Sequence, residues 1–124
     1  MFADTHAFSG FAVDDVEEAK RFYGETLGLK VTDGPMGVLN LELAGDRPTM
    51  IYPKPDFRPA TYTILNFPVD SVEAAVDELT SRGVEMERYE GFEQDEKGIM
   101  RDNGPTIAWF TDPAGNILAV LETE

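Results

Sequence analysis

A short segment near the beginning of the chain recurs in its second half. Residues 11–19 read FAVDDVEEA and residues 67–75 read FPVDSVEAA, so six of the nine positions are identical. Each copy continues with apolar residues at helical spacing and then reaches a glycine, Gly28 in the first copy and Gly83 in the second. Internal similarity of this kind indicates a chain built from copies of one supersecondary unit. The sequence therefore predicts two such units in tandem.

The composition excludes several classes of function. No cysteine occurs among the 124 residues, so disulfides, thiolate nucleophiles and thiolate-bound zinc are ruled out. The formal net charge of −14 opposes binding to phosphate backbones, and we expect no nucleic-acid partner. The first residues lack the basic and apolar regions of a signal peptide, and no apolar run approaches the roughly 20 residues that cross a bilayer. We therefore expect a cytoplasmic protein with no membrane partner.

The first copy is predicted to have the order β-α-β-β-β. Asp15, after Asp14, is the expected N-cap of the helix, and Glu18 completes a capping-box pattern with it. The apolar stripe of the helix begins at Val16, and the helix is expected to end at Gly28. The strands are predicted at residues 6–13, 29–32, 38–43 and 49–52.

The second copy repeats this order and defines the fold class as α+β. Its helix is expected to begin after the cap pair Asp70 and Ser71, and residues 91–103 are predicted to be a mobile loop. The strands are predicted at residues 61–69, 84–89, 106–111 and 117–122, with a strong turn signal (DPAGN) at residues 112–116. We predict one domain, residues 1–124, with module one at about 5–53, a stiff linker at 53–60 and module two at about 61–122.

Three motifs resemble the vicinal oxygen chelate superfamily, which includes glyoxalase I, extradiol dioxygenases and bleomycin-resistance proteins. They are the pattern from Phe11 to Tyr23, the LGL of residues 27–29, and the WFTDPAGNIL of residues 109–118. Together with the repeat, they cover nearly the whole chain. The resemblance implies that the two βαβββ modules form a curved, barrel-like mixed sheet around a pocket, with the helices outside and the pocket often completed across a dimer.

Catalytic members of that superfamily hold a divalent metal with His, Gln or Glu side chains from four equivalent strand positions. The resemblance maps three of these positions onto Phe8, Ile64 and Ala119, and the fourth within residues 49–52. None of these residues offers the oxygen or imidazole ligand that such a metal needs, so we expect no metal and no cofactor. His6, the single histidine, is interpreted as a polar residue at the pocket edge, with metal ligation after a register slip as the alternative.

The same positions predict an apolar and aromatic pocket. Residues at a spacing of two share a strand face, and in resembling enzymes the residue three before the Asp-Pro turn also faces the pocket. The predicted ligand-binding residues are Phe8, Asn40, Tyr52, Tyr62, Ile64, Asn66, Trp109 and Ala119. The alternative is an ordinary closed core, which would also contain Phe8 and Ile64. Burying the Asn66 amide in such a core would cost free energy unless the amide had a hydrogen-bond partner. Residues 90–103 are either a lid, whose acidic excess favours a cationic ligand, or a solvated connection.

We therefore predict a metal-free binding protein of the glyoxalase and bleomycin-resistance type. Its partner would be a small organic molecule, cationic or aromatic, and it would act as a homodimer. No catalytic residue is assigned. The alternatives are a metal-dependent lyase or dioxygenase of the glyoxalase I type, and a partner or regulatory module without a small ligand.

Overall fold

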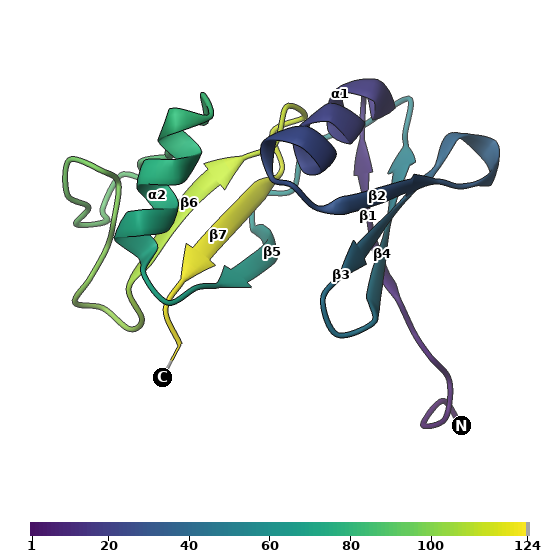
Figure 1. Ribbon diagram of the computed structural model, residues 1–124, viewed down its shortest axis with the longest axis horizontal. Coiled ribbons are helices and arrows are strands. Elements are labelled where there is room, and N and C mark those ends of the chain that lie inside the picture. Colours follow the sequence, from purple (N-terminus) through teal and green to yellow (C-terminus); the bar gives the residue numbers. More distant parts are fainter. Residues whose placement is uncertain (124) are drawn as a thin grey trace. The chain divides into compact units, whose positions relative to one another are not determined.

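The computed structural model describes residues 1–123 and divides into two compact units, Met1–Arg58 and Pro59–Glu124. Each unit has its own sheet and its own helix (Figure 1). Within the described part of the chain, no helix combines the length and the apolar character needed to cross a membrane.

The first unit contains a four-stranded mixed sheet. The strands are β1 (Ser9–Val13), β2 (Lys30–Asp33), β3 (Leu39–Leu43) and β4 (Arg47–Pro53), in the order β1-β4-β3-β2. β1 runs parallel to β4, and the other pairs are antiparallel. This arrangement requires a crossover after β1, which the helix α1 (Val16–Arg21) provides. A 3-10 turn, η2 (Pro35–Gly37), joins β2 to β3.

The helix of the first unit begins where the sequence predicts. The Asp15 carboxylate accepts a hydrogen bond from the Glu18 N–H at 3.1 Å, which satisfies one of the free donors of the first turn. The Glu18 carboxylate pairs with Arg21. After α1 the helix widens into a π-helix, η1 (Phe22–Thr26).

The core of the first unit lies between this helix and one face of the sheet. Tyr23 is fully buried, and its ring centroid lies 5.6 Å from that of Phe11 on β1. β1 also contributes the buried Val13, and β3 and β4 contribute the buried side chains Leu39, Leu41 and Ile51. These residues occupy alternate positions of their strands, so the helix covers a single face of the sheet.

The second unit repeats this topology. Its strands β5 (Thr63–Pro68), β6 (Ile107–Thr111) and β7 (Ile117–Leu121) have the order β5-β7-β6, and β5 runs parallel to β7. The helix α2 (Val72–Ser81) packs against β6 and β7 (Figure 1). Ser71 caps it by accepting the Ala74 N–H at 3.1 Å. The predicted α+β class and the two βαβββ-like modules with mixed sheets are confirmed.

The strand predicted at residues 84–89 does not form. Only Met86 makes a bridge there, to Phe110, and the Glu87 N–H donates to the Trp109 carbonyl at 2.8 Å. The next N–H that could donate to a neighbouring strand is that of Tyr89. It donates instead to the side-chain oxygen of Gln94 at 2.8 Å. A local side-chain bond therefore replaces strand pairing.

β1 is also shorter than predicted. It begins at Ser9, which pairs with Thr49, so the same register would set Phe8 beside Pro48. Proline has no N–H to contribute to a ladder. Residues 6–8 therefore precede the sheet, and all three are exposed.

Candidate functional site

In each unit the sheet face away from the helix carries a row of directly paired residues. In the first unit this row is Gly10, Met50, Asn40 and Thr32, one residue from each strand. Gly10 and Thr32 are exposed, and Asn40 and Met50 are half-buried. Tyr52, which pairs with Ala12, lies on the same face at the next position of this alternation.

The corresponding row of the second unit is Asn66, Ala119 and Trp109. Met86 shows on which side of the sheet this row lies. It pairs with Phe110, and Met86 and Val76 of α2 line the same groove. Phe110 therefore faces α2, and its neighbour Trp109 faces the other way. Ala119 is fully buried and Trp109 is 9% exposed, whereas Asn66 is exposed. Its amide is thus solvated, so the cost of a buried amide does not apply to it.

The repeat makes these two rows equivalent. Aligning Phe11 with Phe67 aligns Gly10 with Asn66, and the strand pairings then match Met50 with Ala119. By this alignment Met50 corresponds to the fourth metal position, which the family resemblance implies within residues 49–52. A thioether suits soft metals and not the hard or borderline divalent ions that oxygen and imidazole ligands hold.

The residues at the metal positions consequently do not fit a divalent metal. Ala119 offers a buried methyl group and Met50 a thioether, while Phe8 and Ile64 offer hydrocarbon. Among residues 1–123, no cluster of three or more His, Cys, Asp or Glu side chains is arranged to hold a metal ion.

Several predicted pocket residues lie outside these rows. Phe8 and Tyr62 precede their strands and are 63% and 70% exposed. Ile64 lies at a bulge, because the pairing of β5 with β7 shifts between Thr63 and Leu65. A bulge adds one residue to a strand and interrupts the alternation of its faces, so Ile64 and Tyr62 cannot be assigned to the face of Asn66 by spacing alone.

Two aromatic residues that the sequence reading did not select contact Trp109. The ring centroid of Tyr89 lies 5.6 Å from that of Trp109, in an edge-to-face arrangement at 76°. The Phe92 centroid is 5.4 Å from Trp109 and 5.8 Å from Tyr89. We call these three residues the aromatic cluster. The sequence signal for this cluster was the presence of two aromatic residues, Tyr89 and Phe92, three positions apart in a segment otherwise rich in charged residues.

The hydroxyl group of Tyr89 is buried and has no hydrogen-bond partner among the described residues. Burial raises the pKa of this phenol, and the charge of Glu87 raises it further. Both effects disfavour the phenolate. At neutral pH Tyr89 therefore carries its proton and can donate it in a hydrogen bond.

The middle of the loop that follows is held by side chains. The Gln94 amide donates to the carbonyls of Glu87 and Gly98 at 2.9 and 2.8 Å. Asp95 accepts the N–H groups of Lys97 and Ile99 and pairs with Arg101. Residues 94–99 therefore have a defined backbone without a helix or strand.

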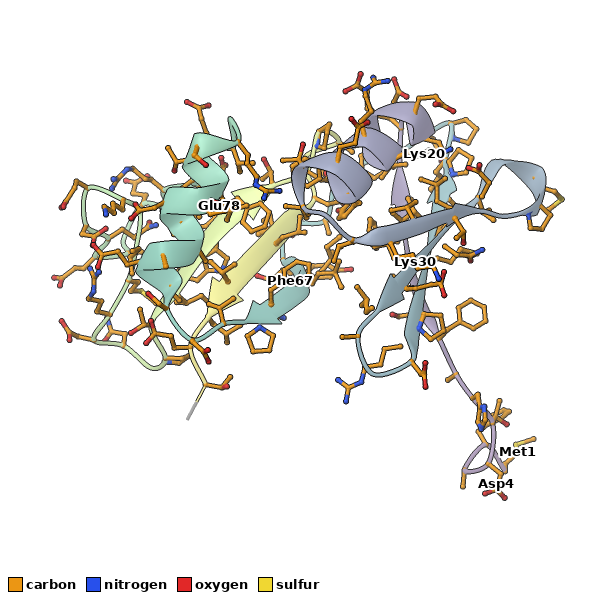
Figure 2. All side chains as sticks on the ribbon, in the orientation of Figure 1. Met1, Asp4, Lys20, Lys30, Phe67 and Glu78 are labelled. Atoms are coloured by element: carbon orange, nitrogen blue, oxygen red, sulfur yellow. The ribbon has the colours of Figure 1, made fainter. Side chains whose placement is uncertain are left out.

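The same loop is attached to α2. Lys97 lies 3.1 Å from a Glu73 carboxylate oxygen and 3.0 Å from one of Asp77. These contacts raise the pKa of Lys97, first through its hydrogen bond with Asp77 and then through that with Glu73. Glu78 of the same helix, labelled in Figure 2, pairs instead with Arg82.

The family comparison agrees with this architecture. Residues 5–120 match the Glyoxalase/Bleomycin resistance protein/Dioxygenase superfamily. The chain therefore belongs to this superfamily. No curated protein sequence matches it significantly.

Solved structures share the fold at low sequence identity. The glyoxalase family protein from Enterococcus faecalis is 24% identical, with 98% of this chain and 100% of that chain covered and a TM-score of 0.68. A glyoxalase/dioxygenase from Nostoc punctiforme is 16% identical, with coverages of 99% and 94% and a TM-score of 0.68. TnmS3, an antibiotic binding protein from Streptomyces sp. CB03234, is 26% identical, with 98% of each chain covered and a TM-score of 0.69.

Proposed function

We propose that this member of the superfamily is a metal-free, cytoplasmic binding protein for a small organic molecule and acts as a homodimer. In each unit taken by itself, the residues proposed to contact a ligand are the apolar and aromatic members of its row. The predicted residues outside the rows, Phe8, Tyr62 and Ile64, would contribute from the adjoining chain.

The observation that carries this proposal is the chemistry of the metal positions. The repeat aligns Met50 with Ala119, and neither side chain can hold the divalent ion on which the catalytic members depend. Binding without metal chemistry needs other features: apolar surface, aromatic rings and a few polar groups that orient the ligand. Trp109, Tyr52, Asn40 and Asn66 are groups of these kinds.

One comparison supports a small-molecule ligand, and the charge of the chain favours a cationic one. TnmS3, which is similar over 98% of its length, is an antibiotic binding protein. The net charge of −14 also favours positively charged ligands over anionic ones.

The test is calorimetric titration with bleomycin and with a panel of cationic aromatic compounds. We expect at least one compound to bind with saturation. Replacing Asn66, which is exposed and lies in the second row, by alanine should weaken this binding by about threefold to tenfold, the value of one hydrogen bond. Asn103→Ala removes an exposed amide elsewhere and should leave the affinity unchanged. Absence of binding by every compound would contradict the proposal.

Two measurements separate the alternatives. Elemental analysis of protein purified without chelators should find no stoichiometric divalent metal, whereas a metal-dependent lyase or dioxygenase would contain one. Native mass spectrometry should give twice the 13.7 kDa mass of the chain, and a co-purified small molecule would argue against a module without a ligand.

A further inference from the structure

The Tyr89 hydroxyl is a buried polar group that the fold leaves unsatisfied. Its oxygen is excluded from solvent and finds no partner within residues 1–123. The great majority of buried polar groups in proteins are hydrogen-bonded, so each exception needs an explanation. A binding role is one such explanation, because a ligand can supply the missing partner.

The surroundings of this hydroxyl are suited to a flat aromatic molecule. The Tyr89 ring packs edge-to-face on Trp109, which belongs to the row of Ala119 and Asn66. Phe92 covers the same indole, with the two ring planes at 45°. The aromatic cluster therefore places a hydrogen-bond donor beside an aromatic surface.

Phe92 is the member of the cluster that a ligand can replace. It is 48% exposed, whereas Trp109 is 9% exposed. It follows Gly91, whose φ of 89° is a conformation that glycine adopts without strain. The backbone at Phe92 is held, because its N–H donates to the Tyr89 carbonyl at 3.1 Å and Gln94 accepts the Tyr89 N–H, so the Phe92 ring would leave Trp109 by rotation of its side chain.

The present spacing leaves no room between the rings. Stacked carbon atoms lie about 3.5 Å apart, so a ring inserted between two others needs a separation of about 7 Å. The Phe92 and Trp109 centroids are 5.4 Å apart. A ligand ring can therefore contact this face of Trp109 only if Phe92 moves away.

We propose that a planar aromatic ligand displaces the Phe92 ring from Trp109 and accepts a hydrogen bond from the Tyr89 hydroxyl through a carbonyl-type oxygen. This proposal rests on the binding function proposed above and assigns its ligand a chemical class. An anionic ligand is disfavoured because Glu87, Glu90 and Glu93 outnumber the single cation Arg88 along this segment.

The first test concerns the protein without ligand. Tyr89→Phe removes an unsatisfied hydroxyl and keeps the ring, so it should raise the midpoint of thermal unfolding by about 3 °C. The matched control is Tyr62→Phe, at a tyrosine that is 70% exposed, which should leave the midpoint unchanged. A lower midpoint for Tyr89→Phe would show that the hydroxyl has a partner in the folded chain and would overturn the proposal.

The second test uses 2-acetylnaphthalene, which has a carbonyl acceptor, and 2-ethylnaphthalene, which lacks one. Binding is followed through the indole N–H signal of Trp109, the single tryptophan, in ¹H–¹⁵N spectra. The acetyl compound should bind about threefold to tenfold tighter than the ethyl compound, and Tyr89→Phe should remove this difference. Phe92→Ala should strengthen the binding of both compounds.

The outcomes separate this proposal from the general one. If members of the cationic panel bind by calorimetry but neither naphthalene shifts the Trp109 signal, even in Phe92→Ala, the binding function stands and this site is refuted. A preference for the acetyl compound that persists in Tyr89→Phe refutes the role of the hydroxyl. Failure of both probes and of the whole panel refutes the binding function itself.

Discussion

Replacement of Asp112 tests whether the turn between β6 and β7 is held by its side chain. Asp112 is 4% exposed, and one of its carboxylate oxygens accepts the N–H groups of Ala114 and Asn116 at 3.0 and 2.8 Å. The other oxygen accepts the side-chain amide of Asn116 at 3.1 Å. Asn116 is itself 2% exposed, so its donors cannot turn to bulk water.

The expected loss of stability for Asp112→Ala is about 3–5 kcal/mol. A hydrogen bond to a charged acceptor contributes about 1.5–3 kcal/mol, so three would sum to roughly 4.5–9 kcal/mol. The three bonds share one side chain and are not additive. The half-buried Ala114 N–H can also regain water, which places the expected loss at or below the lower end of that interval.

Urea unfolding followed by Trp109 fluorescence measures this loss, because the indole lies on β6 three residues before Asp112. With a slope of about 2 kcal/mol/M, the midpoint should fall by roughly 1.5–2.5 M. Asp112→Asn keeps one acceptor oxygen and should lose about half as much. Asp56→Ala, which removes an exposed carboxylate, should not change the midpoint.

A loss below about 1 kcal/mol for Asp112→Ala would refute this reasoning, since one unsatisfied buried donor alone costs that much. The turn would then depend on backbone preferences, such as that of Gly115 with its φ of 96°.

Three further substitutions test the fold. Ser71→Ala removes the cap of α2 and should lower the free energy of unfolding by about 1 kcal/mol in urea titrations, and no loss would contradict the cap. Leu118→Ala empties a fully buried position on β7 and should cost about 2–5 kcal/mol, so a smaller loss would contradict close packing there. Burial raises the pKa of Asp95, but hydrogen bonds from Ile99, Arg101 and Lys97 outweigh it and the net pKa is lowered. The stabilisation by Asp95 should be complete above the ordinary pKa of 3.8 and be lost as the pH falls through the lowered pKa. Asp95→Asn should reduce this dependence of stability on pH in acid unfolding. An acid-unfolding curve of the variant that runs parallel to that of the unchanged protein would contradict the prediction.

The parts of the fold that the sequence predicted depend on local signals. Asp15 and Ser71 cap their helices because a short side-chain acceptor reaches an N–H three residues ahead. The turn at residues 112–116 forms for a similar reason, since Asp112 bonds to groups two and four residues along. Both copies of the repeat carry such signals, so the element order could be derived without tertiary contacts.

The predictions that differed from the structure concern competition for backbone groups. Residues 84–89 have the composition of a strand, but Gln94 takes the Tyr89 N–H that a ladder would need. The bulge at Ile64 similarly depends on how β5 meets β7. In both cases a residue outside the predicted strand determines the backbone pairing. The spacing of residues within that strand carries no information about it.

The sequence by itself determined the repeat, the family and the chemical character of the metal positions, because these follow from which residues stand at which spacing. Tertiary structure decided which residues share a face and which side chains meet. The pairing of β4 with β1 identified Met50 as the counterpart of Ala119. The path of the loop brought Tyr89 and Phe92 onto Trp109. Such contacts join residues distant in sequence, and only the folded chain determines how close they come.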